Sequence, residues 1–500
     1  MLRKLTAAFA LTLLAAAGVF AAGASLIDAI KSGDRAAALT MLQQKVDVNA
    51  PEPNGTTPLH YAAYKEDVEL VDRLLKAGAK PNVTNDFGST PMAEAATVGN
   101  AAIIKLLLKA GADVNSPNRE GQTALMAVAR TGHVDAAAAL LDAGADVNAT
   151  EQWGGQSALM WAASQKQSAM IKLLVERGAN VNARGTPRDW ERRITAEPRP
   201  KDLSRGGFTP LLYAAREGCV ECARYLVSGG ADINLTDPDR TTPLVIALMN
   251  MRFDTAAYLI SAGADLDKWD LYGRSPMYAA VDLSTLPRGG RPDLPSTDET
   301  TALQVIKMML DRGANPNIQL KLRPPFRNVI FDRGSDNAVL TIGATPLLRA
   351  SKAGDNPEAI KLLLEHGAHV DLPNVDGITP LMTATGMGHG NNASRGKYNT
   401  EDDSLAALPL LLKAGANINA HAVDGQTALH SAVQKGWLKV VKFLAENGAD
   451  LDAKDARGRT ALDYAKGNGG AAGRGQAAAG NKEATALLER LIAERAPKQQ

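Results

Sequence analysis

The only two cysteines of the chain, Cys219 and Cys222, are three residues apart and stand at the predicted start of a helix. A Cys-x-x-Cys pair in that position can have a lowered thiol pKa and catalyse thiol–disulfide exchange. In an exported protein the pair can instead form a local disulfide, or remain as two thiols packed between helices. No βαβ pattern surrounds the pair, so we favour the disulfide over buried thiols, and buried thiols over catalysis. Zinc would need two further ligands, and this segment has no other His or Cys.

The histidines, serines and glycines that often form catalytic or nucleotide-binding motifs are present, but they do not occur in the spacing of any such motif. The seven histidines are scattered, and His366 and His369 flank Gly367 rather than lying on one helix face as a metal pair would. The patterns His-Glu-x-x-His and Gly-x-Ser-x-Gly do not occur, and the glycines at 386, 388 and 390 lack the preceding strand and the Gly-Lys-Ser/Thr of a phosphate loop. We therefore expect no enzymatic activity, no cofactor and no metal site.

Arginine and aromatic side chains gather in two stretches, residues 184–206 and 318–342. This composition is typical of protein-binding hot spots, although such a loop can also fold back and use its rings to shield its neighbours. Further aromatic and charged residues lie between the two stretches, and one precedes them. The candidate partner-binding residues are Trp153, Trp190, Phe208, Arg216, Glu217, Trp269, Tyr272, Phe326 and Phe331.

A recurring phrase indicates the elements that must position these residues. It reads Gly, any residue, Thr or Ser, Pro or Ala, Leu or Met, and it occurs eleven times, once with Arg240 in place of the glycine. The threonine can cap a helix whose first position accepts proline, and an apolar run such as residues 103–108 predicts a second helix. Gly-Ala then follows ten times, which suits a left-handed helix end. Seven of the ten spacings are 33 or 34 residues, so we predict stacked two-helix units.

The segment GTTPLHYAAYKEDVELVDRLLKAGAKPN, residues 55–82, resembles an ankyrin repeat, and the resemblance recurs in register from Ser25 to about Ala496. It implies an all-α solenoid of helix pairs with β-hairpin fingers, in which the fingers and the inner helices form a concave binding surface. It also implies protein binding without activity or cofactor. The histidine of the Thr-Pro-Leu-His phrase survives only as His60 and His430. Its loss elsewhere should weaken hydrogen bonding at the inner helices and leave the apolar stacking intact.

The repeat register also predicts how the chain is organised. Residues 25–50 read as an N-terminal capping unit, residues 51–457 as further repeats, and residues 458–500 as a C-terminal capping repeat with a Gly/Ala-rich loop, about eleven repeats after the cap. Four insertions interrupt the register. Those at 184–206 and 318–342 fall in fingers, and those at 282–299 and 386–403 fall between paired helices. Because paired helices run antiparallel, the two classes must emerge at opposite ends of the layers.

Residues 1–24 have the composition of a secretory signal. Arg3 and Lys4 precede an uncharged run that lasts until Asp28, and the small residues 22–24 suit a signal peptidase. We predict cleavage before Ser25 and export to the periplasm or the extracellular space, as in a bacterial protein. The alternative is an uncleaved anchor, because 23 uncharged residues could just span a bilayer.

The charge balance restricts the partner. Lys and Arg number 55 against 54 acidic residues, a net charge of +1, which argues against a nucleic-acid partner. We expect a monomer that has no membrane contact after cleavage and binds a protein partner, which the sequence does not identify. Two alternatives remain: a thiol–disulfide protein that uses Cys219 and Cys222, and an exported factor that acts on proteins of a host cell.

Overall fold

The computed structural model describes residues 25–188, 205–284, 297–322, 341–353, 356–387, 400–468 and 480–495. The chain divides into two compact units, Met1–Thr186 (unit 1) and Pro187–Gln500 (unit 2). The boundary falls inside the first finger insertion, whereas the sequence predicts one continuous array.

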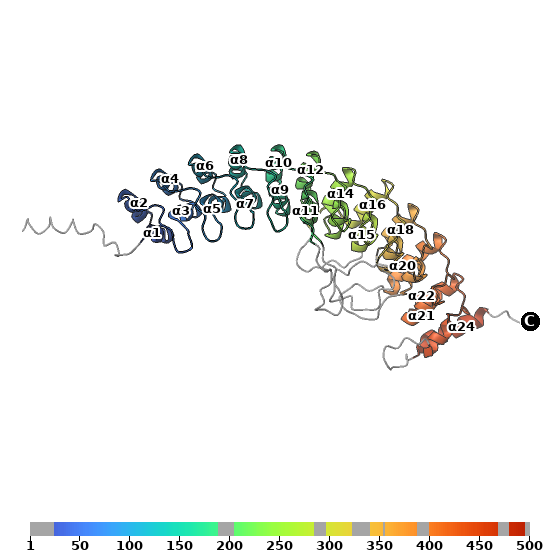
Figure 1. The fold of residues 1–500 in the computed structure, drawn as a ribbon. Coiled ribbons are helices and arrows are strands. Elements are labelled where there is room, and N and C mark those ends of the chain that lie inside the picture. Colours follow the sequence, from blue (N-terminus) through green and yellow to red (C-terminus); the bar gives the residue numbers. More distant parts are fainter. Residues whose placement is uncertain are drawn as a thin grey trace, which may run out of the picture. The chain divides into compact units, whose positions relative to one another are not determined.

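Unit 1 is a row of helix pairs with inner helices along one side and outer helices along the other (Figure 1). The cap consists of α1 (Leu26–Ser32) and α2 (Arg35–Gln43). The inner helices are α3 (Pro58–Tyr64), α5 (Pro91–Val98), α7 (Ala124–Thr131) and α9 (Ala158–Ser164). The outer helices are α4 (Val68–Lys76), α6 (Ala101–Lys109), α8 (Val134–Asp142) and α10 (Ser168–Glu176). Each inner helix packs on the next inner helix, and each outer helix on the next outer helix.

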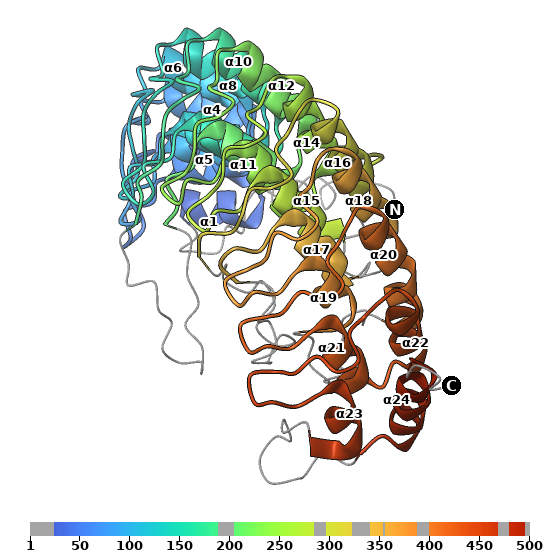
Figure 2. The same cartoon turned by 90° about the vertical axis from the view of Figure 1, so that its right-hand side faces the viewer.

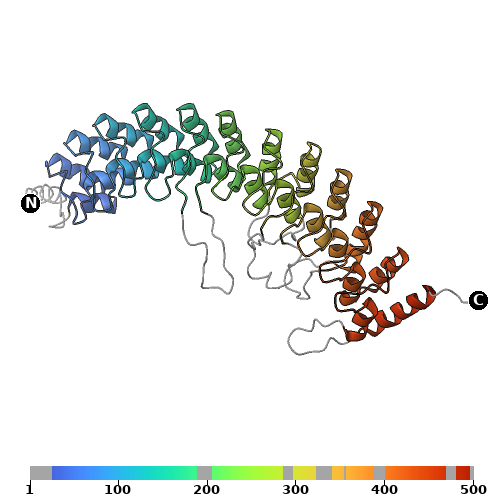
Figure 3. The same cartoon turned by 45° about the vertical axis from the view of Figure 1, so that its right-hand side comes forward.

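Unit 2 repeats this arrangement, and Figures 2 and 3 show its outer helices in sequence beside the inner ones. The inner helices are α11 (Pro210–Glu217), α13 (Pro243–Met249), α15 (Pro276–Ser284), α17 (Pro346–Ala353), α19 (Pro380–Ala384), α21 (Ala428–Lys435) and α23 (Ala461–Asp463), the last continued by a π-helical turn, η1 (Tyr464–Asn468). The outer helices are α12 (Val220–Ser228), α14 (Phe253–Ser261), α16 (Ala302–Leu310), α18 (Pro357–Glu365), α20 (Glu401–Lys413), α22 (Leu438–Glu446) and α24 (Lys482–Arg495). The described residues thus form twelve helix pairs, a cap and eleven repeats, which confirms the all-α solenoid.

The helix ends follow the local chemistry of the repeated phrase. The hydroxyl of Thr90 accepts the backbone N–H of Ala93 (3.2 Å), and Thr209 and Thr242 cap α11 and α13 in the same way. The glycines of all ten Gly-Ala pairs have φ between 84° and 94°. An added Cβ at these glycines would meet no atom within 4 Å. Their requirement for glycine is therefore conformational, since the left-handed region is costly for other residues.

The core consists of aliphatic side chains between the two rows of helices. In α6, Ile103, Ile104 and Leu107 are fully buried, while Lys105 and Lys109 on the opposite face are exposed. The inner helices contribute mainly alanine and leucine, which permits thin layers. Because each repeat buries its apolar face only on its neighbours, the stability of each unit is distributed along its row.

The fingers contain no strand in the described residues, which corrects the expected β-hairpins. Each finger is a tight turn in which few residues pair. Asn85 accepts the N–H of Gly88 through its backbone oxygen (2.9 Å) and donates its own N–H to Ser89 (3.0 Å). Isolated bridges join Thr150 to Ser157 and Pro187 to Gly206. The arms of each finger are too short for the ladder of hydrogen bonds that defines a strand.

An asparagine near the end of most repeats joins neighbouring layers. The side chain of Asn115 donates to the backbone oxygen of Gly144 (3.2 Å) and accepts the N–H of Asp146 (2.8 Å). Six asparagines make both bonds: Asn49, Asn82, Asn115, Asn148, Asn317 and Asn419. Asp267 and Asp371 occupy the same position, and their carboxylates accept the N–H but have nothing to donate to the glycine carbonyl. We call this arrangement the asparagine clamp.

Several predictions fall outside the described residues: the signal segment 1–24, most of the four insertions, and the Gly/Ala-rich loop. The described edges show where the insertions leave the fold. Arg188 donates its N–H to the oxygen of Arg205 (2.7 Å), so the ends of the first insertion are paired at a finger. The insertions at 282–299 and 386–403 interrupt the connections from α15 to α16 and from α19 to α20.

Candidate partner-binding surface

The fingers of unit 2 lie side by side because backbone hydrogen bonds join each to the next. The N–H of Leu271 donates to the oxygen of Asp239 (2.9 Å), and that of Lys321 donates to Tyr272 (2.8 Å). The guanidinium of Arg205 extends the row through the carboxylate of Asp239 (3.2 Å). Behind the fingers, α11, α13 and α15 pack in the same order. The predicted site residues of these three repeats are therefore held on adjacent layers.

Arg216 lies at the centre of a small cluster at α11. Its guanidinium stands 5.1 Å from the ring centre of Tyr213 and 5.6 Å from that of Phe208, and it pairs with Glu217 (2.8 Å). The two rings meet edge to face at 5.4 Å. Phe208 is only 7% exposed, which corrects its predicted role: it supports Arg216 rather than offering its own ring. Arg216 and Glu217 remain partly exposed and present one charge of each sign.

Trp269 is half-buried beneath the guanidinium of Arg240, which lies 4.4 Å from the indole centre. Arg240 holds the place that glycine takes in the other copies of the phrase and keeps the positive φ of that place, 63°. This conformation is costly for a residue with a Cβ. The exposed arginine and the indole together form a cation–π pair, an interaction that strengthens when a partner removes water from it.

Tyr272 stands beside a buried ion pair in its own finger. The guanidinium of Arg274 donates to the carboxylate of Asp270 through two nitrogens (2.9 and 2.6 Å), and its centre lies 5.6 Å from the Tyr272 ring. The Asp270 carboxylate also accepts the N–H groups of Tyr272 and Arg274, both at 2.9 Å. This geometry fixes the finger that carries Trp269 and Tyr272, so both rings are positioned before any partner arrives.

Four candidates remain. Trp153 is 69% exposed on a finger of unit 1. Trp190, Phe326 and Phe331 lie outside the described residues.

Comparison with known proteins gives the family. A model of three consecutive ankyrin repeats matches residues 26–118, 115–185, 300–394 and 398–472, and a single-repeat model matches residues 206–238. These matches cover more than two thirds of the chain. The chain belongs to the ankyrin repeat family. Ankyrin repeats generally mediate protein–protein interaction, and proteins built from them are typically non-enzymatic.

A solved ankyrin repeat structure is also similar to part of this chain. The ankyrin repeat domain of human ASB11 is 23% identical and aligns with a TM-score of 0.40 over 49% of this chain and 99% of that domain. The search of curated proteins finds no match. Residues 239–299 lie outside the ankyrin matches, yet α13 and α14 form a helix pair like the others. The repeat that has lost its phrase glycine to Arg240 is therefore an ankyrin repeat in structure.

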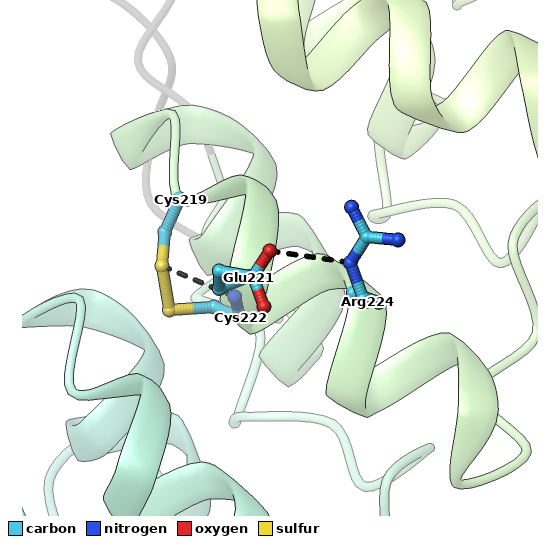
Figure 4. The surroundings of a disulfide bond; sticks show 4 residues. All are labelled: Cys219, Glu221, Cys222 and Arg224. Atoms are coloured by element: carbon cyan, nitrogen blue, oxygen red, sulfur yellow. Dashed lines mark hydrogen bonds and ion pairs between the residues drawn. A yellow bond between two sulfur atoms is a disulfide. The ribbon is translucent and has the colours of Figure 1, made fainter.

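A disulfide joins Cys219 and Cys222 at the start of α12 (Figure 4). Cys219 is the N-cap residue: its sulfur accepts the N–H of Cys222 (3.2 Å). Cys222 is fully buried, whereas Cys219 is only partly so, and the nearby ion pair of Glu221 and Arg224 (3.2 Å) is exposed. A reductant in solution therefore reaches the sulfur of Cys219 more readily than that of Cys222.

Sequence reasoning missed three contributors to this surface: Tyr213, Arg240 and Arg274. Arg240 stands where the other copies of the phrase have glycine, and this departure could have marked it as a candidate from the sequence. Tyr213 could have been found from its place on an inner helix, and Arg274 from its spacing of four residues after Asp270. Only the structure shows that each arginine lies over a ring.

No group of three or more His, Cys, Asp or Glu side chains in the described part of the chain could hold a metal ion. Within the same residues, every helix is too short or too polar to cross a membrane.

Proposed function

We propose that this ankyrin repeat protein is an exported, non-enzymatic scaffold that binds a protein partner with the fingers and inner helices of unit 2. The observation that carries the proposal is the series of Arg–aromatic pairs on adjacent repeats: Arg216 with Tyr213, Arg240 with Trp269, and Arg274 with Tyr272. Arginine, tryptophan and tyrosine are the residue types that dominate binding energy at protein interfaces.

The chemistry of the surface indicates the kind of partner. Arg216 is partly neutralised by Glu217, but Arg240 is exposed and makes no ion pair within the described residues. A partner surface that is acidic and partly apolar would complement the guanidinium groups and the rings. The proposed setting, periplasm or extracellular space, rests on the composition of residues 1–24.

Site-specific photo-crosslinking tests the proposal. A photoreactive phenylalanine analogue would replace Trp269 in one variant and Lys361, an exposed residue of outer helix α18, in a matched control. Both would be expressed in the native host and irradiated. We expect one predominant protein adduct from position 269 and none from position 361. Equal adducts from both positions, or adducts from position 361 alone, would place the interface elsewhere.

Thiol–disulfide exchange is the second candidate function, because the partly exposed Cys219 and the buried Cys222 share a helix N-terminus. Such a position stabilises a thiolate. Reduction of insulin by the purified protein with dithiothreitol as the electron source is the test. Turnover that disappears in Cys219→Ser would support catalysis, and a rate equal to that of dithiothreitol alone would leave the disulfide with a structural role.

A further inference from the structure

Unit 1 has an unusual distribution of aromatic side chains. Among residues 25–186, all of which are described, Phe, Tyr and Trp occur only at Tyr61, Tyr64, Phe87, Trp153 and Trp161. Every one lies on a finger or an inner helix, and none is buried. Phe87 is 71%, Trp153 69% and Tyr64 52% exposed. Aromatic rings ordinarily fill cores because of the area they bury, so this placement is not explained by folding.

Three of these rings, Tyr61, Tyr64 and Trp161, lie at fixed positions of the inner helices of unit 1. Positions at the repeat spacing form two rows along α3, α5, α7 and α9, which pack in that order. The first row is Tyr61, Glu94, Ala127 and Trp161, and the second is Tyr64, Thr97, Arg130 and Ser164. The first row has a ring at each end and the second has one at its start. Two exposed fingertip rings, Phe87 and Trp153, accompany the rows on the same repeats.

The repeat spacing selects an extended ligand. Adjacent helix layers are about 10 Å apart, and one turn of a polyproline II helix advances about 9.3 Å in three residues. A chain in this conformation would present the same side to each successive repeat. Proline-rich segments dock on aromatic surfaces at little entropic cost because their conformation is already set. Their backbone carbonyls are unpaired and can accept hydrogen bonds from the protein.

The charges of the face add one requirement. Lys31 lies over the Tyr61 ring (5.2 Å) but is neutralised by Glu52 (2.8 Å). Arg130 lies over the Trp161 ring (5.5 Å), is exposed, and has no carboxylate partner in the described part of the chain. A ligand that covers Trp161 would therefore gain from a negative charge placed beside Arg130.

We propose that the finger and inner-helix face of unit 1 binds an extended, proline-rich segment of a partner protein, with an acidic side chain of that segment opposite Arg130. This face shares no residue with the surface proposed for unit 2. Either proposal can fail without the other, because the variants that test them are in different units.

Selection from a displayed library of random peptides of about twelve residues, roughly four polyproline turns, tests the proposal on the full-length chain. We expect the enriched peptides to carry proline at a spacing of three and at least one acidic residue. Failure to enrich any peptide, or enrichment of sequences without proline, would overturn the proposal.

The enriched peptide then identifies the face. Its affinity, measured by fluorescence anisotropy, should fall about five-fold or more in Phe87→Ala and in Trp153→Ala. Both side chains are too exposed for folding to depend on them. Val423→Ala, a fingertip change in unit 2 where the side chain is 75% exposed, is the matched control and should leave affinity unchanged. Unchanged affinity in the Phe87→Ala, Trp153→Ala double variant would contradict the assignment.

A double-mutant cycle tests the charge. Arg130→Gln and replacement of the acidic residue of the peptide by its amide should each weaken binding, and the two together should weaken it no more than either alone. Fully additive losses would show that Arg130 does not face the acidic side chain.

Discussion

The guanidinium of Arg130 lies 5.5 Å from the ring centre of Trp161, across the contact between α7 and α9. Arg216 occupies the equivalent position of α11 and lies 5.1 Å from Tyr213. An arginine at the same place of an inner helix therefore covers an aromatic ring in each unit. Because both partners of each pair reach the surface, each unit has its own preformed Arg–aromatic contact on the finger and inner-helix side.

The asparagine clamp should contribute measurably to stability. Asn115→Ala removes a donor and an acceptor between adjacent layers, and we expect a loss of about 1 to 2 kcal/mol in urea unfolding. The converse change is Asp371→Asn, which restores the missing donor to a junction where only the N–H of Asn417 is bound. It should raise stability by about 0.5 to 1 kcal/mol. A destabilised Asp371→Asn variant would show that the clamp does not transfer between junctions.

Asp237 should make unit 2 less stable above pH 6. Burial raises the pKa of its carboxyl to about 6, against 3.8 in an ordinary aspartate. The carboxyl accepts the N–H groups of Asp239 and Thr241 (2.9 and 2.7 Å). Asn85 makes the equivalent two bonds with a neutral amide. The folded state binds the proton more tightly than the unfolded state, so stability falls as pH rises from about 4 to 6 and is then constant.

Asp237→Asn should therefore be more stable than the wild type by about 1 to 3 kcal/mol at pH 7. The difference should vanish near pH 4, and thermal melts across that range would measure it. Asp270→Asn is the matched control at the same place of the next finger, where the carboxylate is paired with Arg274. It should be destabilising at pH 7. Equal effects of the two substitutions on stability would show that burial of the Asp237 carboxyl does not cause the loss of stability.

His60 and His430 should produce the opposite pH dependence. Burial lowers the pKa of both side chains below 6.5. The Nε2 of each lies near a backbone oxygen of the following repeat, at 3.0 and 3.1 Å, and its Nδ1 lies near the preceding threonine. The unfolded state binds protons more readily, so stability is lost as pH falls below about 6.5. Met126 occupies the position of His60 in another repeat. The variant His60→Met should be less stable than the wild type at pH 7, and its stability should depend less on acid. An unchanged slope of unfolding free energy against pH would contradict this account.

The repeat phrase predicts most of the fold because its signals are local. Threonine caps, proline at the first helical position and glycine after the outer helix act within a few residues. The structure has each of these helix starts and ends at the residues that the phrase predicts. Phe208 shows what such signals miss. Its exposure depends on the finger against which it packs, and Thr241 and Ile378, at the equivalent place of other repeats, are also buried. The burial of this position therefore comes from packing that the sequence alone does not show.

The candidate site was less predictable than the fold. The arginine and aromatic residues could be read from the sequence, but which arginine covers which ring depends on packing between repeats. Arg240 over Trp269 joins residues 29 positions apart, in different layers. Of the aromatic face of unit 1, the sequence candidates include only Trp153, because the exposure of Tyr64 and Phe87 depends on packing between repeats.

Leu107→Ala tests the packing of unit 1. Leu107 is fully buried in α6, and its truncation should cost about 2 to 5 kcal/mol. Since neighbouring repeats stabilise one another only through direct contact, we expect unit 1 to melt before unit 2 in the variant. Calorimetry that shows a single transition with wild-type cooperativity at a lower temperature would argue against this packing.

The central claim is that unit 2 binds a protein partner through its Arg–aromatic pairs. The most direct test measures how much of the partner, once cross-linking has identified it, is captured by purified variants that carry no cross-linker. The variant with Arg216→Gln, Arg240→Gly and Trp269→Ala removes two of the three pairs and leaves Arg274, whose ion pair with Asp270 holds the finger, in place. Arg240→Gly also relieves a strained backbone. The control carries Lys361→Ala, Lys413→Ala and Lys442→Ala on outer helices. We expect the first variant to recover the partner about ten-fold less efficiently or worse, with an unchanged far-UV spectrum, and the control to match the wild type. Equal recovery by both variants would contradict the account.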